Sequence, residues 1–217
     1  MGIWNLPEAR KGSAMRRYFI TLFTVTALVC VCATASAQVF YEYPGAPVVT
    51  ENEPVIGTCL GIGDELFRID GYARFNLSPT MDLGLELLFD NFDENWRYGA
   101  GGDVKYAIVP KDVTMPFDLS LNGGFGFESG NDITTLVFPV GGLISRPLEL
   151  SSGRTLVPYG GVYLLLVHTS VGSFSNTESD VELRGGANFN VDDQADLFAA
   201  LHLGAGTMFY IGINWHL

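Results

Sequence analysis

The stretch RIDGYARFNL, residues 68–77, alternates between polar and apolar side chains with a period of two. This alternation predicts a β-strand whose two faces meet different surroundings. All of its charged residues share one face, and the opposite face carries none. The polar face holds Arg68, Asp70, Tyr72, Arg74 and Asn76, and the apolar face holds Ile69, Gly71, Ala73, Phe75 and Leu77.

The same pattern returns along the chain and predicts an all-β protein. Alternating stretches cover residues 81–89, 97–108, 117–128, 181–190, 195–203 and 208–217, and more uniformly apolar ones cover 133–145 and 156–168. A short run at 55–63 supplies a tenth strand. Pro139 lacks the N–H that a strand ladder needs, so it predicts a bulge or a local break. After residue 37 no stretch has sustained helical periodicity.

Clusters of Pro, Gly, Asn, Asp and Ser separate these stretches, as expected of hairpin connections. We expect the longest connection to be a loop at residues 168–179. The predicted fold is a closed antiparallel up-and-down transmembrane β-barrel over residues 55–217, with about ten strands. Eight is the alternative, because single-chain bacterial barrels have even strand numbers.

The N-terminal segment reads as an export signal. Arg16 and Arg17 precede an apolar stretch, and Ala35-Ser36-Ala37 is a small-residue cleavage signature. We therefore expect residues 1–37 to be a signal peptide, with a possible misassigned start before Met15, and residues 38–54 to be a periplasmic lead. Of the three cysteines only Cys59 would remain, so no internal disulfide is expected.

Composition favours a membrane barrel over nucleic-acid or anionic-surface binding. The formal net charge is −12, which argues against a nucleic-acid partner. Charged residues make up 17% of the chain, against about 25% in ordinary soluble domains, and there are 26 glycines. Low charge, high glycine content and export are typical of a small barrel in the bacterial outer membrane, where we expect a monomer surrounded by lipid.

The polar faces fit the lumen of such a barrel better than a water-facing surface. After the signal segment only Lys105 and Lys111 are lysines, whereas soluble sheets commonly carry many. Opposite charges beside glycines suit a narrow lumen in which ions must pair. The residues predicted to line the lumen are Arg68, Asp70, Arg74, Asp82, Glu86, Arg97, Asp103, Lys105, Glu182 and Arg184. A soluble exported lipocalin-like ligand-binding barrel, with its apolar faces inward, is the alternative.

The signal, the hairpin arrangement, TLVPYGGVYLLL (155–166) and FYIGINWHL (209–217) resemble the small bacterial outer-membrane barrels of the OmpA/OmpX/OmpW type. The resemblance is architectural and covers most of 55–217. It implies that the barrel-assembly machinery reads the last strand. That assembly signal would be Phe209, Ile211, Ile213, Trp215 and Leu217, with Leu217 in place of the usual final aromatic residue.

Catalytic and metal-binding patterns are weak in this sequence. The three histidines are scattered, so neither a metal site nor a cofactor is expected. His168, Ser170 and Glu182 resemble in their spacing the Ser-His-acid residues of outer-membrane lipid A deacylases, which implies an alternative as a lipid-modifying hydrolase. The leading expectation is a non-enzymatic barrel, either a structural anchor or a narrow pore for small solutes or ions.

Overall fold

The computed structural model describes residues 45–48, 53–63, 66–92, 95–108, 116–204 and 206–217. The chain divides into two compact units, Met1–Thr34 and Ala35–Leu217. The first unit lies outside the described residues, and so does the predicted signal peptide. All of the strands belong to the second unit. No helix among the described residues is long and apolar enough to cross a membrane.

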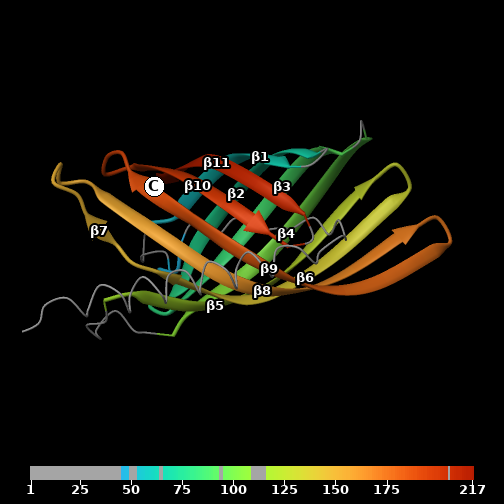
Figure 1. The fold of residues 1–217 in the computed structure, drawn as a ribbon, viewed down its shortest axis with the longest axis horizontal. Coiled ribbons are helices and arrows are strands. Elements are labelled where there is room, and N and C mark those ends of the chain that lie inside the picture. The colour runs from blue at the N-terminus through green and yellow to red at the C-terminus, as the bar shows by residue number, and fades with distance from the viewer. Residues whose placement is uncertain (1–44, 49–52, 64–65, 93–94, 109–115, 205) are drawn as a thin grey trace, which may run out of the picture. The chain divides into compact units, whose positions relative to one another are not determined.

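Ten strands form one closed antiparallel barrel (Figure 1). The barrel strands are β1 (Val55–Gly63), β2 (Leu66–Ser78), β3 (Met81–Phe92), β4 (Asn95–Ala107), β5 (Asp118–Gly130), β6 (Ile133–Ser145), β8 (Thr155–Val171), β9 (Phe174–Asn190), β10 (Ala195–Leu203) and β11 (Thr207–His216). Each pairs with its neighbours in sequence, and β1 pairs with β11 to close the wall. The very short β7 (Leu148–Glu149) pairs only with the start of β8. The predicted ten strands are confirmed, and the alternative of eight is wrong.

The two ends of the barrel differ in their connections. At the terminal end, where β1 begins and β11 finishes, the connections include residues 108–117 and 146–154. At the opposite end, here called the hairpin end, two or three residues join each pair of strands. The loop expected at 168–179 is wrong: β8 and β9 continue through it and turn at Gly172 and Ser173. Gly172 has a φ of +58°, which glycine adopts without strain in a tight hairpin.

The break predicted at Pro139 is confirmed. Pairing of β5 with β6 runs to Gly123↔Val140 and resumes in the same register at Gly126↔Val137, so it is interrupted opposite Pro139. On its other edge Pro139 pairs in register with Leu165 of β8. The proline therefore costs a few ladder interactions on one side only, and the barrel stays closed.

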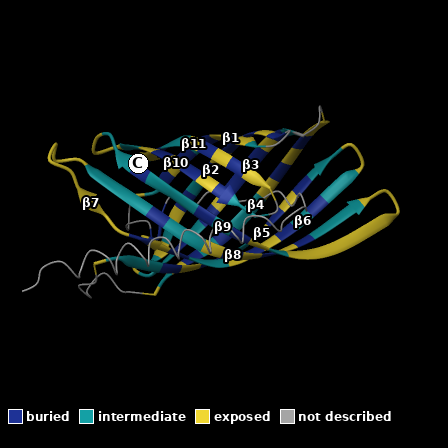
Figure 2. Ribbon diagram, in the orientation of Figure 1, coloured by how far each residue is buried: buried dark blue, intermediate teal, exposed yellow. Residues whose placement is uncertain are grey.

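Burial alternates along the barrel strands, except at the start of β9, where residues 174–179 are all exposed (Figure 2). Large apolar side chains such as Leu87 (69% exposed), Val140 (61%) and Leu85 (50%) point outward. Across all ten described barrel strands, no Asp, Glu, Lys or Arg occupies an outward-facing position. The lipocalin-like alternative required the apolar faces inside, whereas the structure has them outside.

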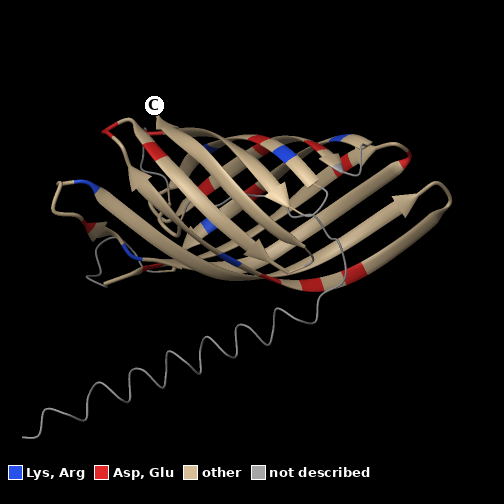
Figure 3. Cartoon of the chain, turned by 45° about the horizontal axis from the view of Figure 1, so that its top comes forward, with Lys and Arg blue, Asp and Glu red and all other residues tan. Residues whose placement is uncertain are grey.

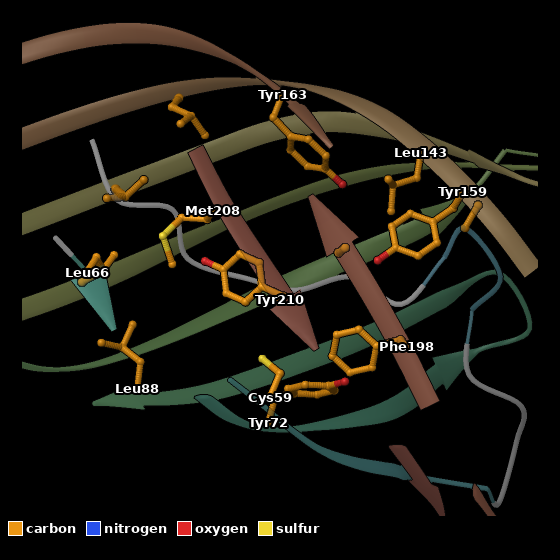
Figure 4. Close-up of a cluster of buried hydrophobic side chains, with 14 of the residues drawn as sticks. Cys59, Leu66, Tyr72, Leu88, Leu143, Tyr159, Tyr163, Phe198, Met208 and Tyr210 are labelled. Carbon is orange, nitrogen blue, oxygen red and sulfur yellow. The ribbon is translucent and has the colours of Figure 1, made fainter. Parts of the chain in front are cut away.

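Large side chains fill the interior by lying over glycines of the next strand. A Cβ on Gly57 would overlap the ring of Tyr72, and one on Gly61 would come within 2.7 Å of the ring of Tyr210. Real Cβ atoms essentially never approach other atoms so closely, so these glycines make room for the aromatic rings. Figure 4 shows the resulting cluster of buried side chains, including Tyr72, Tyr210 and Phe198.

Candidate functional site

The interior of the barrel is the candidate site, since the polar residues gather there. All ten residues predicted to line the lumen are buried, and none is more than 8% exposed. They come from β2, β3, β4 and β9, so most belong to one side of the wall. Figure 3 shows how Lys, Arg, Asp and Glu are distributed over the strands. Because an unpaired buried charge is costly, their contacts determine what the interior can do.

One cluster is centred on Arg74 of β2. Its guanidinium binds the carboxylates of Asp82 on β3 and Asp103 on β4, the latter at 2.8 Å. Asp103 is two strands away, and Gly84 of the intervening β3 lies between them. A Cβ on Gly84 would overlap the Asp103 carboxylate and come within 2.7 Å of Arg74 Nη1. The missing side chain of Gly84 thus permits an ion pair across β3.

A second cluster lies nearer the hairpin end. Asp90 accepts a hydrogen bond from Arg68 (2.9 Å) and another from Arg97 Nε (2.9 Å). Arg97 Nη2 also lies 3.0 Å from Glu128 Oε1. Asp90 and Glu128 were not among the predicted lumen residues, although Glu128 ends the alternating stretch 117–128. Their even-numbered positions continue the inward alternation of β3 and β5, and that parity could have identified them.

The opposite side of the lumen holds a third group around Tyr163 of β8. The guanidinium of Arg184 lies 4.0 Å from the centroid of the Tyr163 ring, and Arg184 also pairs with Glu182. The Tyr163 hydroxyl accepts a hydrogen bond from Asn122 Nδ2 at 2.8 Å. Asn122 is on β5, with β6 between it and β8. The contact therefore spans more than one strand interval and helps to fill the interior.

Every barrel strand contributes at least one inward side chain that is 2% exposed or less. In strand order these include Cys59, Arg68, Asp82, Lys105, Ser120, Val137, Tyr163, Glu182, His202 and Tyr210. Side chains so little exposed touch almost no water-sized space. Each strand therefore packs at least one side chain tightly against other protein atoms inside the barrel.

Part of the predicted lead lies inside the barrel at the terminal end. Lys105 Nζ donates hydrogen bonds to the backbone carbonyls of Gly45 (3.0 Å) and Pro47 (3.1 Å). The Ala46 N–H donates to Ser145 Oγ at 3.3 Å. Ala46 and Val48 are 1% and 5% exposed. Residues 45–48, here called the luminal strap, belong to the segment that was expected to be a periplasmic lead. Their sequence contains no pattern that indicates a position inside the barrel.

A cavity of about 260 Å³ remains beside the luminal strap. Its lining combines apolar residues such as Val48, Val55 and Val157 with polar and charged residues, which include Arg74, Lys105, Asn188, Asn214, Asp196 and His216. His216 Nε2 lies 2.9 Å from Asp196 Oδ2 at this end. The barrel interior thus holds many tightly packed side chains, and this cavity, here called the vestibule, remains at the terminal end.

Two of the three weak catalytic candidates, His168 and Ser170, lie together, but the third does not join them. Ser170 Oγ lies 3.4 Å from His168 Nε2, and His168 Nδ1 lies 2.7 Å from Thr177 Oγ1. His168 and Ser170 occupy outward positions of β8, whereas Glu182 is 1% exposed in the lumen. Glu182 pairs with Tyr163, which is five residues from His168 along β8, or roughly 16 Å. The wall therefore separates the acid from the histidine.

The last strand has the predicted division of faces. Phe209, Ile211 and Trp215 are exposed on the outer wall, whereas Tyr210 and Asn214 are 2% exposed in the lumen. Ile213 and Leu217 share the outer face with them. Among the described residues no group of His, Cys, Asp and Glu is arranged to hold a metal ion.

Comparison with known proteins finds distant structural likeness. The sequence matches no family model and no curated protein. Solved structures with a similar arrangement include a bacterial polysaccharide outer membrane secretin (13% identity, TM-score 0.48, covering 77% of this chain and 66% of that one). Others are the KdgM porin (11%, 0.42, 75% and 99%) and the translocator domain of the autotransporter NalP from Neisseria meningitidis (10%, 0.48, 78% and 90%).

The resemblance to outer-membrane β-barrels is one of architecture. The closed ten-stranded antiparallel barrel confirms the predicted fold class. At such low sequence identity, structural similarity does not indicate a substrate, a partner or a mechanism for this chain.

Proposed function

We propose that this chain is an outer-membrane β-barrel whose lumen is closed by its own side chains, and that it acts as a structural element of the envelope. Three features support the proposal: the chemistry of the outer wall, the position of the chain ends and the packing of the lumen.

The outer wall supports insertion into lipid. A Lys or Arg at the bilayer midplane of a barrel costs about 2–4 kcal/mol, so lipid-facing surfaces exclude charge. The ten described barrel strands carry no Asp, Glu, Lys or Arg on this face. On β8 the outward residues are uncharged and mostly apolar from Leu156 to Leu166 and become polar at His168. That length fits the roughly 9–11 residues with which a tilted strand crosses a bilayer.

Aromatic residues near the strand ends agree with the same placement. Phe89 and Trp96 stack near the hairpin end with ring centroids 4.8 Å apart, and both are exposed. Trp215 is exposed near the terminal end. Aromatic girdles at the two interfaces are typical of barrels in lipid.

The even strand number puts both strand ends of the chain, Val55 and His216, at one end of the barrel. In bacterial outer-membrane barrels that end faces the periplasm. The vestibule and the luminal strap would then open to the periplasm, and the hairpin end would face outward. Assembly by the barrel-assembly machinery and a monomeric state in the lipid belong to the same proposal.

The packing of the lumen favours a structural role over a pore. Every strand contributes a nearly inaccessible side chain, and ion pairs bridge strands that are not neighbours. A cation pathway is the second candidate, favoured by the charged residues around the vestibule of about 260 Å³ at the terminal end.

Recording from planar bilayers tests this choice. The folded chain should give no single-channel steps in KCl. Protease protection of the chain in vesicles of the same lipid demonstrates that it inserts. Stable, cation-selective steps from inserted protein would contradict the closed lumen and support the pore.

A further inference from the structure

Strand β9 is much longer than its neighbour β10, and this difference leaves an open sheet edge. β9 has 17 residues and β10 has 9. Pairing between them stops at Leu203↔Leu183, whereas pairing with β8 continues to Val171↔Phe174 at the turn. Among the described residues, no strand lies beside residues 174–181 on the β10 side. We call this segment the open edge of β9.

The backbone of the open edge presents hydrogen-bonding groups in a fixed order. Alternate residues of an antiparallel strand direct their N–H and C=O to opposite neighbours. The Val191 N–H donates to the Ala195 carbonyl on the β10 side at 2.9 Å, so odd-numbered residues of β9 face that side. Ser175, Thr177 and Ser179 therefore direct theirs outward. The Val181 N–H is already bound by Asp180 Oδ1 at 2.7 Å.

Apart from the charges of Glu178 and Asp180, the usual protections of a sheet edge are missing from the described residues here. Natural edges are commonly blocked by lysine, proline, a bulge or a covering segment. The open edge contains neither lysine nor proline, and the β8–β9 register is unbroken along it. Residues 174–179 are all exposed, with Phe174 at 82%. The backbone of this edge is thus available for pairing with another strand.

Charge indicates which strand would fit. The open edge carries Glu178 and Asp180, and the connections of the hairpin end contain Asp64, Glu65, Asp93, Glu94 and Asp132 but no Lys or Arg. The projecting β8–β9 hairpin likewise shows acidic and no basic residues (Figure 3). Two copies paired through this edge would bring acidic side chains opposite each other, which is unfavourable.

We propose that the open edge of β9 binds an extended segment of a partner protein as an added β-strand, and that this segment carries Lys or Arg at alternate positions. Backbone hydrogen bonds to Ser175, Thr177 and Ser179 supply the pairing. Glu178 and Asp180 select basic side chains on the partner. This interaction is independent of whether the lumen conducts.

The proposal is tested with the full mature chain in detergent micelles and a labelled peptide of alternating Lys and Thr. A peptide of alternating Glu and Thr is the control. Fluorescence anisotropy should detect binding of the Lys peptide only. Amide exchange at Ser175, Thr177 and Ser179 should slow when it binds, which simple charge attraction would not cause.

The variant Ser179→Pro removes an outward N–H without touching the bonds to β8, and Ser179→Ala keeps that N–H. We expect Ser179→Pro to weaken binding by about tenfold, since a strand hydrogen bond and its neighbours are lost, and Ser179→Ala to bind like the parent. An unchanged shift between heated and unheated gel samples verifies that both variants fold. Absence of Lys-peptide binding, equal binding to the Ser179→Pro variant, or self-association through this edge would each overturn the proposal.

Discussion

The ring of Tyr72 on β2 lies over Gly57 on β1, and its hydroxyl donates a hydrogen bond to Asn214 on β11. The aromatic side chain thereby spans the seam at which the first and last strands close the barrel. It can do so only because Gly57 has no Cβ. The seam is thus held by side-chain packing as well as by the β1–β11 ladder.

Gly57→Ala should destabilise the barrel, because the new methyl group overlaps the Tyr72 ring. Overpacking of this kind costs about 1–3 kcal/mol. Gly71→Ala is the matched control, since nothing lies within 4 Å of a Cβ built there on the outer wall. The free energy of unfolding, measured by urea titration in lipid vesicles, should fall for Gly57→Ala and stay level or rise for Gly71→Ala. Equal effects of the two changes would contradict the seam packing.

Arg74→Met should be strongly destabilising because it leaves Asp82 and Asp103 without the cation between them. Removing one partner of a buried ion pair typically costs about 3–5 kcal/mol. The triple variant Arg74→Met, Asp82→Asn, Asp103→Asn should recover part of that loss, since no unpaired carboxylate remains, although Lys105 loses the nearby Asp82 carboxylate. The same urea titration measures both. A triple variant as unstable as the single one would show that volume, not charge, dominates this cluster.

A lysine on the outer wall should cost more near the middle of the barrel than at its end. Leu87 and Leu217 are 69% and 64% exposed, so the two sites differ mainly in depth. Leu87→Lys should lose about 2–4 kcal/mol of folding free energy in lipid, and Leu217→Lys about 0–1 kcal/mol. Folding yield into vesicles gives a second readout. Equal tolerance at both sites would mean that this face does not meet hydrocarbon.

Lys105→Met should release the luminal strap, because Lys105 binds the carbonyls of Gly45 and Pro47. A thiol introduced by Val48→Cys, in a Cys59→Ser background, reports its position. In the parent this thiol is expected to react slowly with a water-soluble maleimide, since Val48 is 5% exposed. Adding Lys105→Met should speed labelling by about tenfold, as expected when roughly 1–2 kcal/mol of hydrogen bonding is lost. Equal labelling rates with and without Lys105→Met would show that other contacts keep the strap in place.

Alternation with a period of two was enough to predict the strands and the division of each barrel strand into a buried and an exposed face. It succeeds because a strand reverses the direction of its side chains at every residue, and a charge in lipid is expensive. Leu88 on the polar face of β3 shows the remaining ambiguity: it faces inward although it is apolar. The break at Pro139 also followed from one residue's chemistry.

Other features depend on strand register, which one sequence does not specify. The contact of Tyr72 with Gly57, and of Arg74 with Asp103 across Gly84, require knowing which residues lie side by side. Residues 168–179 were misread as a loop because Ser, Thr and Asn favour turns, although they also pair well in an exposed hairpin. The luminal strap carries no periodic pattern at all, so its position inside the barrel could not be predicted.

The outer face of this barrel is proposed to lie in lipid. Intrinsic fluorescence of Trp96 and Trp215 tests it most directly, because a chain that starts at Gln38 contains these two tryptophans alone and both lie on the outer wall near opposite ends. The folded protein should be quenched by lipids brominated near the headgroups more strongly than by lipids brominated at the acyl-chain ends. Fluorescence from folded protein that no brominated lipid quenches would contradict the membrane barrel.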